Sequence, residues 1–206
     1  MAARLWTDPI PLLLASTSAT RRALLESAGI DVETQASGVD ERAVEEAAAG
    51  QALDPVSLAR RLAAEKALAV SRRHPNRIVL GADQVLDRGG VVFHKPQNRE
   101  EARAQLQSLQ GRRHALHAAG ALARGGEVVA RFHASATLAM RALGPDAIET
   151  YLALAGPEVL HSVGVYQVEG LGIHLFEEVE GDHSTVLGLP LLPLLSHLRR
   201  LGCLAF

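Results

Sequence analysis

The sequence predicts an α/β fold in which a mixed, elongated sheet is flanked by helices. Two observations predict it. Short apolar runs alternate with helical patterns, which is typical of parallel strands joined by helices. Two long β-rich stretches then follow one another across a Gly-Gly turn, which is typical of antiparallel pairing. The chain shows no internal repeat or linker, so residues 1–206 are expected to form one domain.

Caps and helix breakers delimit the elements of the first half. Ser18 and Asp54 are suitable N-caps, Pro55 suits a first helical position, and Gly29 ends a helix. The elements expected here are a strand at 10–16, a helix at 18–30, an extended segment at 31–37, a helix within 38–50 and a long helix from 54 to about 74.

Glycine pairs mark the hairpins of the second half, at Gly89-Gly90 and Gly125-Gly126. Asn98 is the expected cap of the next helix. The elements expected here are strands at 77–87 and 91–95, a helix at 98–111, long strands at 112–124 and 127–140, a helix at 144–154, a glycine-rich strand region at 161–181 and a helix from about 190.

The composition is that of an ordinary globular protein, with 48% hydrophobic and 21% charged residues. The formal net charge of −2 gives no basic surface for nucleic acid or anionic lipid. No apolar run is long enough to span a membrane, and the N-terminal run makes a poor signal peptide. With a single cysteine, Cys203, we expect a cytoplasmic enzyme or binding protein without disulfides.

The helix that begins near residue 18 carries two cations in its first turn, Arg21 and Arg22. Cations are unfavourable at the positive end of a helix dipole unless an anion binds there. Free N–H groups, the hydroxyls of Ser16 and Ser18, and an arginine fork together suit a phosphate. The alternative is an ordinary capped helix with solvated arginines.

Lys66 interrupts the apolar stripe of the long helix at the centre of its inward face. The stripe consists of Ala59, Leu62, Ala63, Ala67 and Val70. A lysine at this position either extends to the surface or meets an anion.

Asp83 lies in a strand that is apolar on both sides, where an ionised carboxylate requires a partner. Further carboxylates follow at candidate loop or strand ends, and Lys95 adds a cation just before a proline. These further carboxylates are Asp40, Glu41, Glu169 and Asp182. They either hold a divalent cation or are exposed loop charges. Cations for a polyphosphate beside carboxylates for a metal indicate phosphoryl-group chemistry.

Several sequence blocks resemble, in order and spacing, those of the Maf family of nucleoside triphosphate pyrophosphatases. The resemblance covers nearly the whole chain. The blocks are LASTSATRRALLESAGI at 14–30, VDE at 39–41, LAAEKA at 62–67, GADQV at 81–85, KP at 95–96, YQVEGLGI at 166–173 and EGDHSTVLGLPL at 180–191.

The resemblance implies a fold similar to that of the inosine triphosphate pyrophosphatases, with two lobes around a cleft. It implies hydrolysis of a nucleoside triphosphate to a monophosphate and pyrophosphate, a divalent metal cofactor (Mg²⁺ or Mn²⁺) and a homodimer. The family is associated with septum formation and arrest of cell division, and with removal of modified nucleotides.

The resemblance also assigns roles to single residues. Asp83 is the catalytic proton acceptor, and Glu41 and Asp83 hold the metal. The substrate-binding residues are Ser16, Ser18, Arg21, Lys66 and Lys95.

The resemblance implies that three positions select the base: Thr20, Gln84 and Glu169. Gln84 and Glu169 match the branch that acts on 7-methyl-GTP, whereas Thr20 stands where that branch has tryptophan. We therefore expect a preference for a methylated purine. The alternatives are a pyrophosphatase of the dTTP/UTP type, a phosphatase or sugar-nucleotide hydrolase, and a non-catalytic nucleotide-binding regulator of septum formation.

Overall fold

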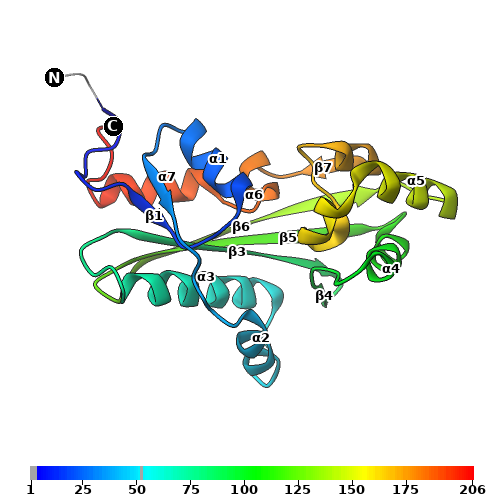
Figure 1. Ribbon diagram of the computed structural model, residues 1–206, viewed down its shortest axis with the longest axis horizontal. Coiled ribbons are helices and arrows are strands. Elements are labelled where there is room, and N and C mark those ends of the chain that lie inside the picture. Colours follow the sequence, from blue (N-terminus) through cyan, green and yellow to red (C-terminus); the bar gives the residue numbers. More distant parts are fainter. Residues whose placement is uncertain (1–3, 52) are drawn as a thin grey trace.

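The computed structural model describes residues 4–51 and 53–206, and it confirms the predicted mixed sheet flanked by helices (Figure 1). The strand order is β2-β1-β3-β5-β6-β7, with β4 also paired to β3. β1 is parallel to β2 and β3, and the remaining pairs are antiparallel. The strands are β1 (Leu12–Leu14), β2 (Val32–Thr34), β3 (Val79–Arg88), β4 (Val91–Phe93), β5 (Arg113–Arg124), β6 (Glu127–Met140) and β7 (Phe176–Glu180).

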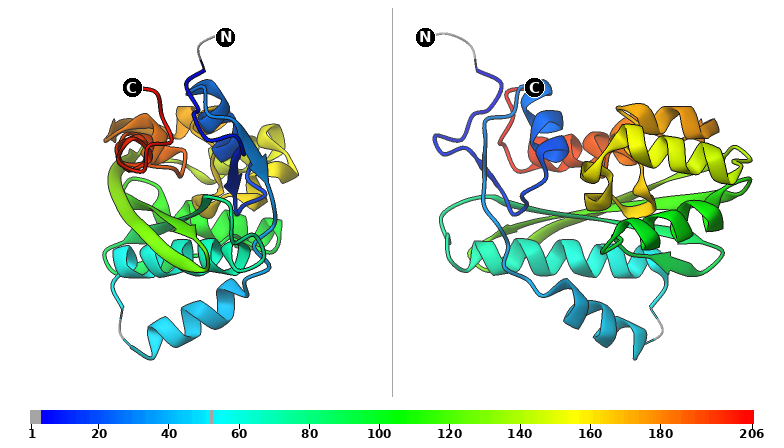
Figure 2. Two further views of the ribbon diagram at one scale, coloured as in Figure 1. Left: turned by 90° about the vertical axis from the view of Figure 1, so that its left-hand side faces the viewer. Right: turned by 45° about the vertical axis from the view of Figure 1, so that its right-hand side comes forward.

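The helices cover both faces of the sheet (Figures 1 and 2). They are α1 (Ala19–Ser27), α2 (Glu41–Ala49), α3 (Pro55–Ser71), α4 (Arg99–Leu109), α5 (Pro145–Ala155), α6 (His183–Val186) and α7 (Leu191–Arg200). Helix α3 lies along one face, with α2 outside it, whereas α1 and α7 lie on the opposite face (Figure 2). The predicted caps Ser18, Asp54 and Asn98 each accept a hydrogen bond from the backbone of their helix.

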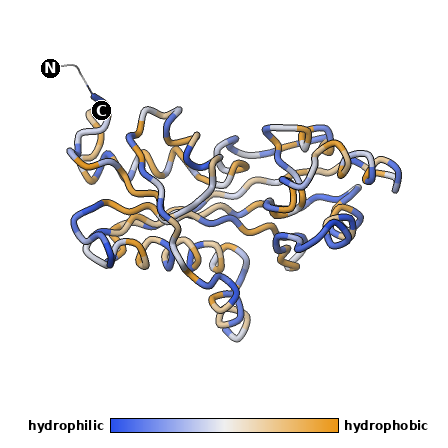
Figure 3. Tube along the Cα trace, viewed as in Figure 1, coloured by the Kyte–Doolittle hydropathy of each residue, from blue (hydrophilic) through white to orange (hydrophobic). Residues whose placement is uncertain are grey.

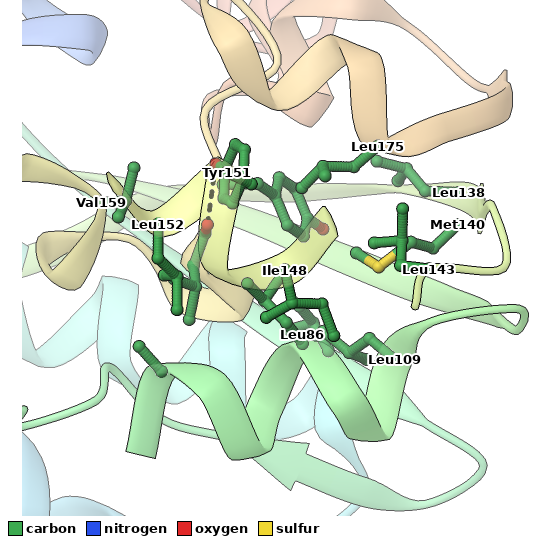
Figure 4. Close-up of a cluster of buried hydrophobic side chains, with 14 of the residues drawn as sticks. Leu86, Leu109, Leu138, Met140, Leu143, Ile148, Tyr151, Leu152, Val159 and Leu175 are labelled. Atoms are coloured by element: carbon green, nitrogen blue, oxygen red, sulfur yellow. Dashed lines mark hydrogen bonds between the residues drawn. The ribbon is translucent and has the colours of Figure 1, made fainter. Parts of the chain in front are cut away.

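Two hydrophobic clusters form the ends of the molecule. One lies near the termini and joins α1 and α7 to the sheet through residues such as Leu14, Leu25 and Leu194. The other lies at the far end, where α4 and α5 pack on β5 and β6 (Figure 4). Hydrophilic residues concentrate on the periphery, for example along α4 (Figure 3).

The glycine-rich region at 161–181 is predicted wrongly as strand for most of its length. It forms 3₁₀ turns, and only its last residues form β7. The turns are η1 (Pro157–His161), η2 (Val163–Val165) and η3 (Leu171–Leu175). Gly164, with φ of 77°, and Val165, with φ of 65°, are left-handed, which is incompatible with an extended strand. The four-residue helix α6 is also absent from the prediction, and α3 ends at Ser71 rather than near His74.

No helix among residues 4–51 and 53–206 combines the length and apolarity needed to cross a membrane.

Candidate active site

The site lies at a gap in the sheet beside β3. β1 pairs with β3 at Val79 and Leu80, and β4 pairs with it only from Leu86 onward. Between these points, the described strands pair with β3 from the β5 side only. Neighbouring side chains of a strand point to opposite faces. Asp83 and Gln84 therefore meet the open edge from opposite faces of the sheet.

Helix α3 lies unusually close to β3 at this gap, because Gly81 has no side chain. A Cβ atom on Gly81 would collide with the backbone oxygen of Ala63 and would lie 2.5 Å from the backbone nitrogen of Ala67. The close approach brings Lys66 of α3 against the β3 face that carries Asp83. The apolar stripe predicted on either side of Lys66 is buried.

Lys66 joins two carboxylates. Its Nζ lies 2.6 Å from Oδ1 of Asp83 and 2.7 Å from Oε1 of Glu41. The side chains of Lys66 and Asp83 are 8% and 9% exposed, whereas that of Glu41 is 48% exposed. Of the two alternatives for Lys66, the structure shows the pairing with an anion. Since both carboxylates contact one ammonium group, they lie within two hydrogen-bond lengths of each other.

Burial and charge shift the pKa values of these groups in different directions. Burial raises the pKa of Asp83, and the charges of Lys66 and Arg21 offset this only in part. Burial also acts to raise the pKa of Glu41. There, the hydrogen bond and charge of Lys66, helped by Lys95 and Arg21, outweigh burial, and the pKa falls below its ordinary value. The buried carboxylate is thus the more basic of the two.

The N-terminus of α1 presents hydroxyl and amide groups to the same space. Oγ of Ser18 accepts the backbone N–H of Arg21 at 3.3 Å, and Oγ of Ser16 accepts the N–H of Ser18 at 3.1 Å. Both oxygens act as acceptors in these bonds, so each hydroxyl hydrogen can be donated to a ligand. Arg22, in contrast, pairs with Glu26 at 2.7 Å and belongs to an exposed helix face.

Arg21 is fixed behind the helix start, because its Nε donates to the carbonyl of Gly188 at 2.9 Å. Its two terminal nitrogens are not needed for that bond. Burial lowers the pKa of the Arg21 guanidinium, against the opposing charges of Asp83 and Glu41. These charges place the guanidinium in the field of both carboxylates.

A cleft of about 600 Å³ runs from this charged end to a second wall formed by residues 158–169. Ser16, Ser18, Arg21, Lys66 and Glu41 line the charged end. An adjoining hollow of about 920 Å³ contains Asp83 and shares Glu41, Gln84 and Lys95 with the first. Lys95 is exposed at the boundary between the two. The predicted cleft is thus present, and it lies between the two hydrophobic clusters.

The three expected base-selecting residues all line the cleft, but they do different things. Oγ1 of Thr20 donates to Oε1 of Glu169 at 3.2 Å, which joins the start of α1 to the opposite wall. The side-chain amide of Gln84 donates to the carbonyls of Thr185 and Val186, at 3.1 and 3.0 Å. Gln84 therefore holds α6 against the sheet.

Two further acidic candidates are helix caps. Asp40 accepts the N–H of Ala43 at 3.1 Å at the start of α2. Asp182 accepts the N–H of Thr185 at 2.9 Å and the hydroxyl of Ser184 at the start of α6. Both carboxylates are exposed and act as helix caps in this structure.

The carboxylate donors nevertheless fit a divalent cation. In the described chain, no group of three or more His, Cys, Asp or Glu side chains is gathered as a metal site. Lys66 occupies one oxygen of Asp83 and one of Glu41, and no described residue donates a hydrogen bond to the other oxygen of either. Mg²⁺ commonly takes one or two protein carboxylates and completes its shell with water and substrate phosphates.

Sequence reasoning missed much of the second wall. Glu158, His161, Ser162 and Tyr166 line the cleft, and none of them had been given a role. His161, Ser162 and Tyr166 lie in the segment predicted wrongly as strand, and Glu158 lies between that segment and the preceding predicted helix, so the fold of this region hid them. The YQVEGLGI block at 166–173 was the available signal.

Comparisons with known proteins agree on one family. The family model described as Maf-like protein matches residues 11–201. A nucleoside triphosphate pyrophosphatase of Rhodopseudomonas palustris (strain BisB18) is 51% identical over 202 residues, which cover 98% of this chain and 99% of that protein. A 7-methyl-GTP pyrophosphatase of Mesorhizobium japonicum is 49% identical over 193 residues, covering 94% and 97%.

A solved HAM1 protein from Coxiella burnetii aligns over 63% of this chain and 72% of its own, with 14% identity and a TM-score of 0.37.

Proposed function

Since this chain belongs to the Maf-like protein family, we propose that it is a nucleoside triphosphate pyrophosphatase that releases a nucleoside monophosphate and pyrophosphate. Relatives that bear this name are about half identical over nearly their full length. One observation carries the proposal: Lys66, Asp83 and Glu41 form a charged cluster at the open edge of β3, beside the N-terminus of α1. This combination suits a phosphate chain and a hydrolytic water.

Different residues at the charged end of the cleft bind and neutralise the phosphates. Phosphoanhydride cleavage requires mainly positioning and neutralisation of charge. The α1 N-terminus, the hydroxyls of Ser16 and Ser18 and the terminal nitrogens of Arg21 bind phosphate oxygens. Lys66 uses two N–H groups on carboxylates and has a third for the substrate, and exposed Lys95 adds a cation at the entrance.

Asp83 accepts the proton of the attacking water in this proposal. A bond forms between the water oxygen and a phosphorus of the α–β anhydride, the bond from that phosphorus to the α–β bridging oxygen breaks, and the leaving product carries that oxygen and the electron pair. A carboxylate with a raised pKa is a better proton acceptor than an ordinary aspartate. Glu41 and Asp83 would hold Mg²⁺ or Mn²⁺, which supplies charge neutralisation and lowers the pKa of bound water.

For the base, we propose a purine that carries a positive charge, such as 7-methylguanine. The carboxylate of Glu169 is exposed at the cleft wall and is oriented by Thr20, so it suits a cationic ring or an amino group. The relative from Mesorhizobium japonicum, named 7-methyl-GTP pyrophosphatase, is consistent with this choice. Thr20 provides no aromatic ring to stack on the base. Recognition of the base therefore depends on Glu169 and on the second wall of the cleft, to which Glu169 belongs.

We also propose that the protein is a cytoplasmic homodimer. The support is the family resemblance, together with a composition that offers no basic surface for nucleic acid. Light scattering after size-exclusion chromatography tests the dimer directly, with a mass twice that of the 21.9 kDa chain as the expected result.

A panel of triphosphates tests the function. GTP, 7-methyl-GTP, dTTP, UTP and ATP are incubated with Mg²⁺ or Mn²⁺, and pyrophosphate, orthophosphate and monophosphate are measured separately. We expect equal amounts of pyrophosphate and monophosphate, with 7-methyl-GTP the best substrate. Release of orthophosphate alone would indicate a phosphatase. Binding without any product would favour the alternative of a non-catalytic regulator of septum formation.

A further inference from the structure

The second wall of the cleft begins with a strained bend. Val165 has φ of 65° and is the only described residue other than glycine with a positive φ. A β-branched residue in this conformation is a genuine outlier and persists only where its surroundings hold it. Gly164 precedes it at φ of 77°, and a Cβ there would lie 2.5 Å from Leu86 and 2.6 Å from the ring of Tyr166.

The hydroxyls of two buried tyrosines anchor this bend to neighbouring elements. The hydroxyl of Tyr151 on α5 donates to the carbonyl of Val165 at 2.9 Å, as the dashed line in Figure 4 shows. The hydroxyl of Tyr166 lies 2.7 Å from Nε2 of His114 on β5. All four residues are buried. The strained bend is therefore held by two hydrogen bonds, one to a side chain of α5 and one to a side chain of β5.

His114 lowers the stability of the folded chain at this position. Its ring packs against those of Tyr166 and Phe176, with centroids 5.6 and 5.9 Å away. Its Nδ1 is buried and has no hydrogen-bond partner in the described chain. A buried polar group with an unmade bond costs stability, and an apolar residue would avoid that cost. Burial lowers the pKa of His114 to about 4, so the ring is neutral at physiological pH.

The bend determines where the cleft wall lies. Tyr166, Gln167, Val168 and Glu169 follow it directly and all line the cleft. Glu169 then meets Thr20 at the start of α1. The charged cluster of Asp83, Lys66 and Glu41, in contrast, is built on β3, α3 and α2, and its ion pairs involve no residue of the bend. A change in the bend should therefore alter the nucleoside end and leave the phosphate end in place.

We propose that His114 and Tyr151 are positioning residues for nucleoside recognition. Their hydrogen bonds to Tyr166 and Val165 hold the strained bend that carries the base-facing wall at residues 166–169. The inference rests on the proposed function, because it assigns a nucleoside to that wall. It also names two residues that never touch the substrate as determinants of its affinity.

The test compares variants that remove one hydrogen bond each. Tyr166→Phe and His114→Phe delete the same bond from its two sides, and Tyr151→Phe deletes the other. His114→Gln retains a group that can bond Tyr166 and serves as the rescue. Leu109→Val, in the same hydrophobic cluster on α4, is the control for a general loss of packing. The readouts are KM and kcat for the triphosphate, and inhibition constants for the monophosphate and for pyrophosphate.

We expect the deletions to raise KM and the monophosphate inhibition constant about three- to tenfold, which corresponds to about one net hydrogen bond. The pyrophosphate inhibition constant and kcat should stay within about twofold of the parent. His114→Gln should lie nearer the parent, and the double variant His114→Phe/Tyr166→Phe should be no worse than either single one. An unchanged KM, or a change matched by Leu109→Val, overturns the inference.

Hydrogen exchange separates this inference from the proposed function. Amides of residues 162–169 should exchange faster in Tyr166→Phe and His114→Phe than in the parent and the Leu109→Val control. If the parent released no pyrophosphate from any triphosphate, the proposed function would fail. Hydrogen exchange and calorimetric binding of the monophosphate would still test the positioning role of His114 and Tyr151. Unchanged hydrogen exchange at residues 162–169 in the variants would overturn it.

Discussion

Replacing Lys66 by methionine tests the charged cluster through stability alone. The variant keeps a chain of similar length but removes the ammonium that contacts Asp83 at 2.6 Å and Glu41 at 2.7 Å. Glu41 is half exposed and can turn to water. Asp83 is 9% exposed and cannot, and loss of one partner from a buried ion pair costs about 3–5 kcal/mol.

The loss should depend on pH in a defined direction. Burial already raises the pKa of Asp83, and removal of Lys66 raises it further. At pH values below about 3.9, the pKa of an aspartate in the unfolded chain, Asp83 is protonated in both the folded and the unfolded state. The cost of its unpaired charge is then absent. As the pH rises above that value, the unfolded state releases the proton first, so stability falls by about 1.4 kcal/mol per pH unit until the folded pKa is passed.

Chemical unfolding between pH 5 and pH 8 measures this effect. Lys66→Met should lose more stability at pH 8 than at pH 5, and adding Asp83→Asn should restore most of it, because the unpaired charge is then gone. Lys95→Met, which removes an exposed cation, is the control and should change stability by less than about 0.5 kcal/mol. A loss that is the same at every pH, or no recovery in the double variant, would refute the reasoning.

Three further predictions concern the surroundings of the cluster. Gly81→Ala should cost about 3 kcal/mol, because its Cβ meets the backbone of α3, whereas Gly50→Ala, whose Cβ would make only ordinary contacts 3.7 Å away, should change stability by less than about 0.5 kcal/mol; equal effects in chemical unfolding would contradict the close approach. Gln84→Ala removes the donor to two carbonyls of α6 and should cost about 1–2 kcal/mol with a raised KM; unchanged stability would contradict its clamping role. Burial, with a smaller contribution from Arg88, lowers the pKa of His114 to about 4, so the unfolded chain takes up a proton first as the pH falls below about 6.5. Relative to His114→Gln, the parent should lose about 3 kcal/mol between pH 7 and pH 4, and parallel pH curves would contradict it.

The sequence was sufficient for the elements with local signals. Asp54 and Pro55 mark the start of α3, and the Gly-Gly pairs mark two hairpins, because capping and turn formation depend on a few adjacent residues. Lys66 was recognised as unusual because it interrupts a buried stripe on its own helix. From that anomaly alone, its pairing with an anion could be anticipated as one of two outcomes, and the structure decides between them.

The fold of the second wall could not be predicted from local sequence signals. His114 and Tyr166 are 52 residues apart, and neither has a local pattern that predicts a bond between them. The bend at Val165 is adopted because tertiary hydrogen bonds hold it, against the conformational preference of valine. The capping role of Asp182 was not predicted, because a cap of a four-residue helix resembles an isolated loop carboxylate in the sequence.

The central claim is that the buried carboxylate of Asp83 drives cleavage of a triphosphate to monophosphate and pyrophosphate. The most direct measurement is product release by the parent and by Asp83→Asn with Mg²⁺ present, with circular dichroism and thermal unfolding showing that both are folded. We predict equal amounts of pyrophosphate and monophosphate from the parent and a rate at least about 100-fold lower from the variant. Equal rates from two folded proteins, or orthophosphate as the sole phosphate product, would contradict the account.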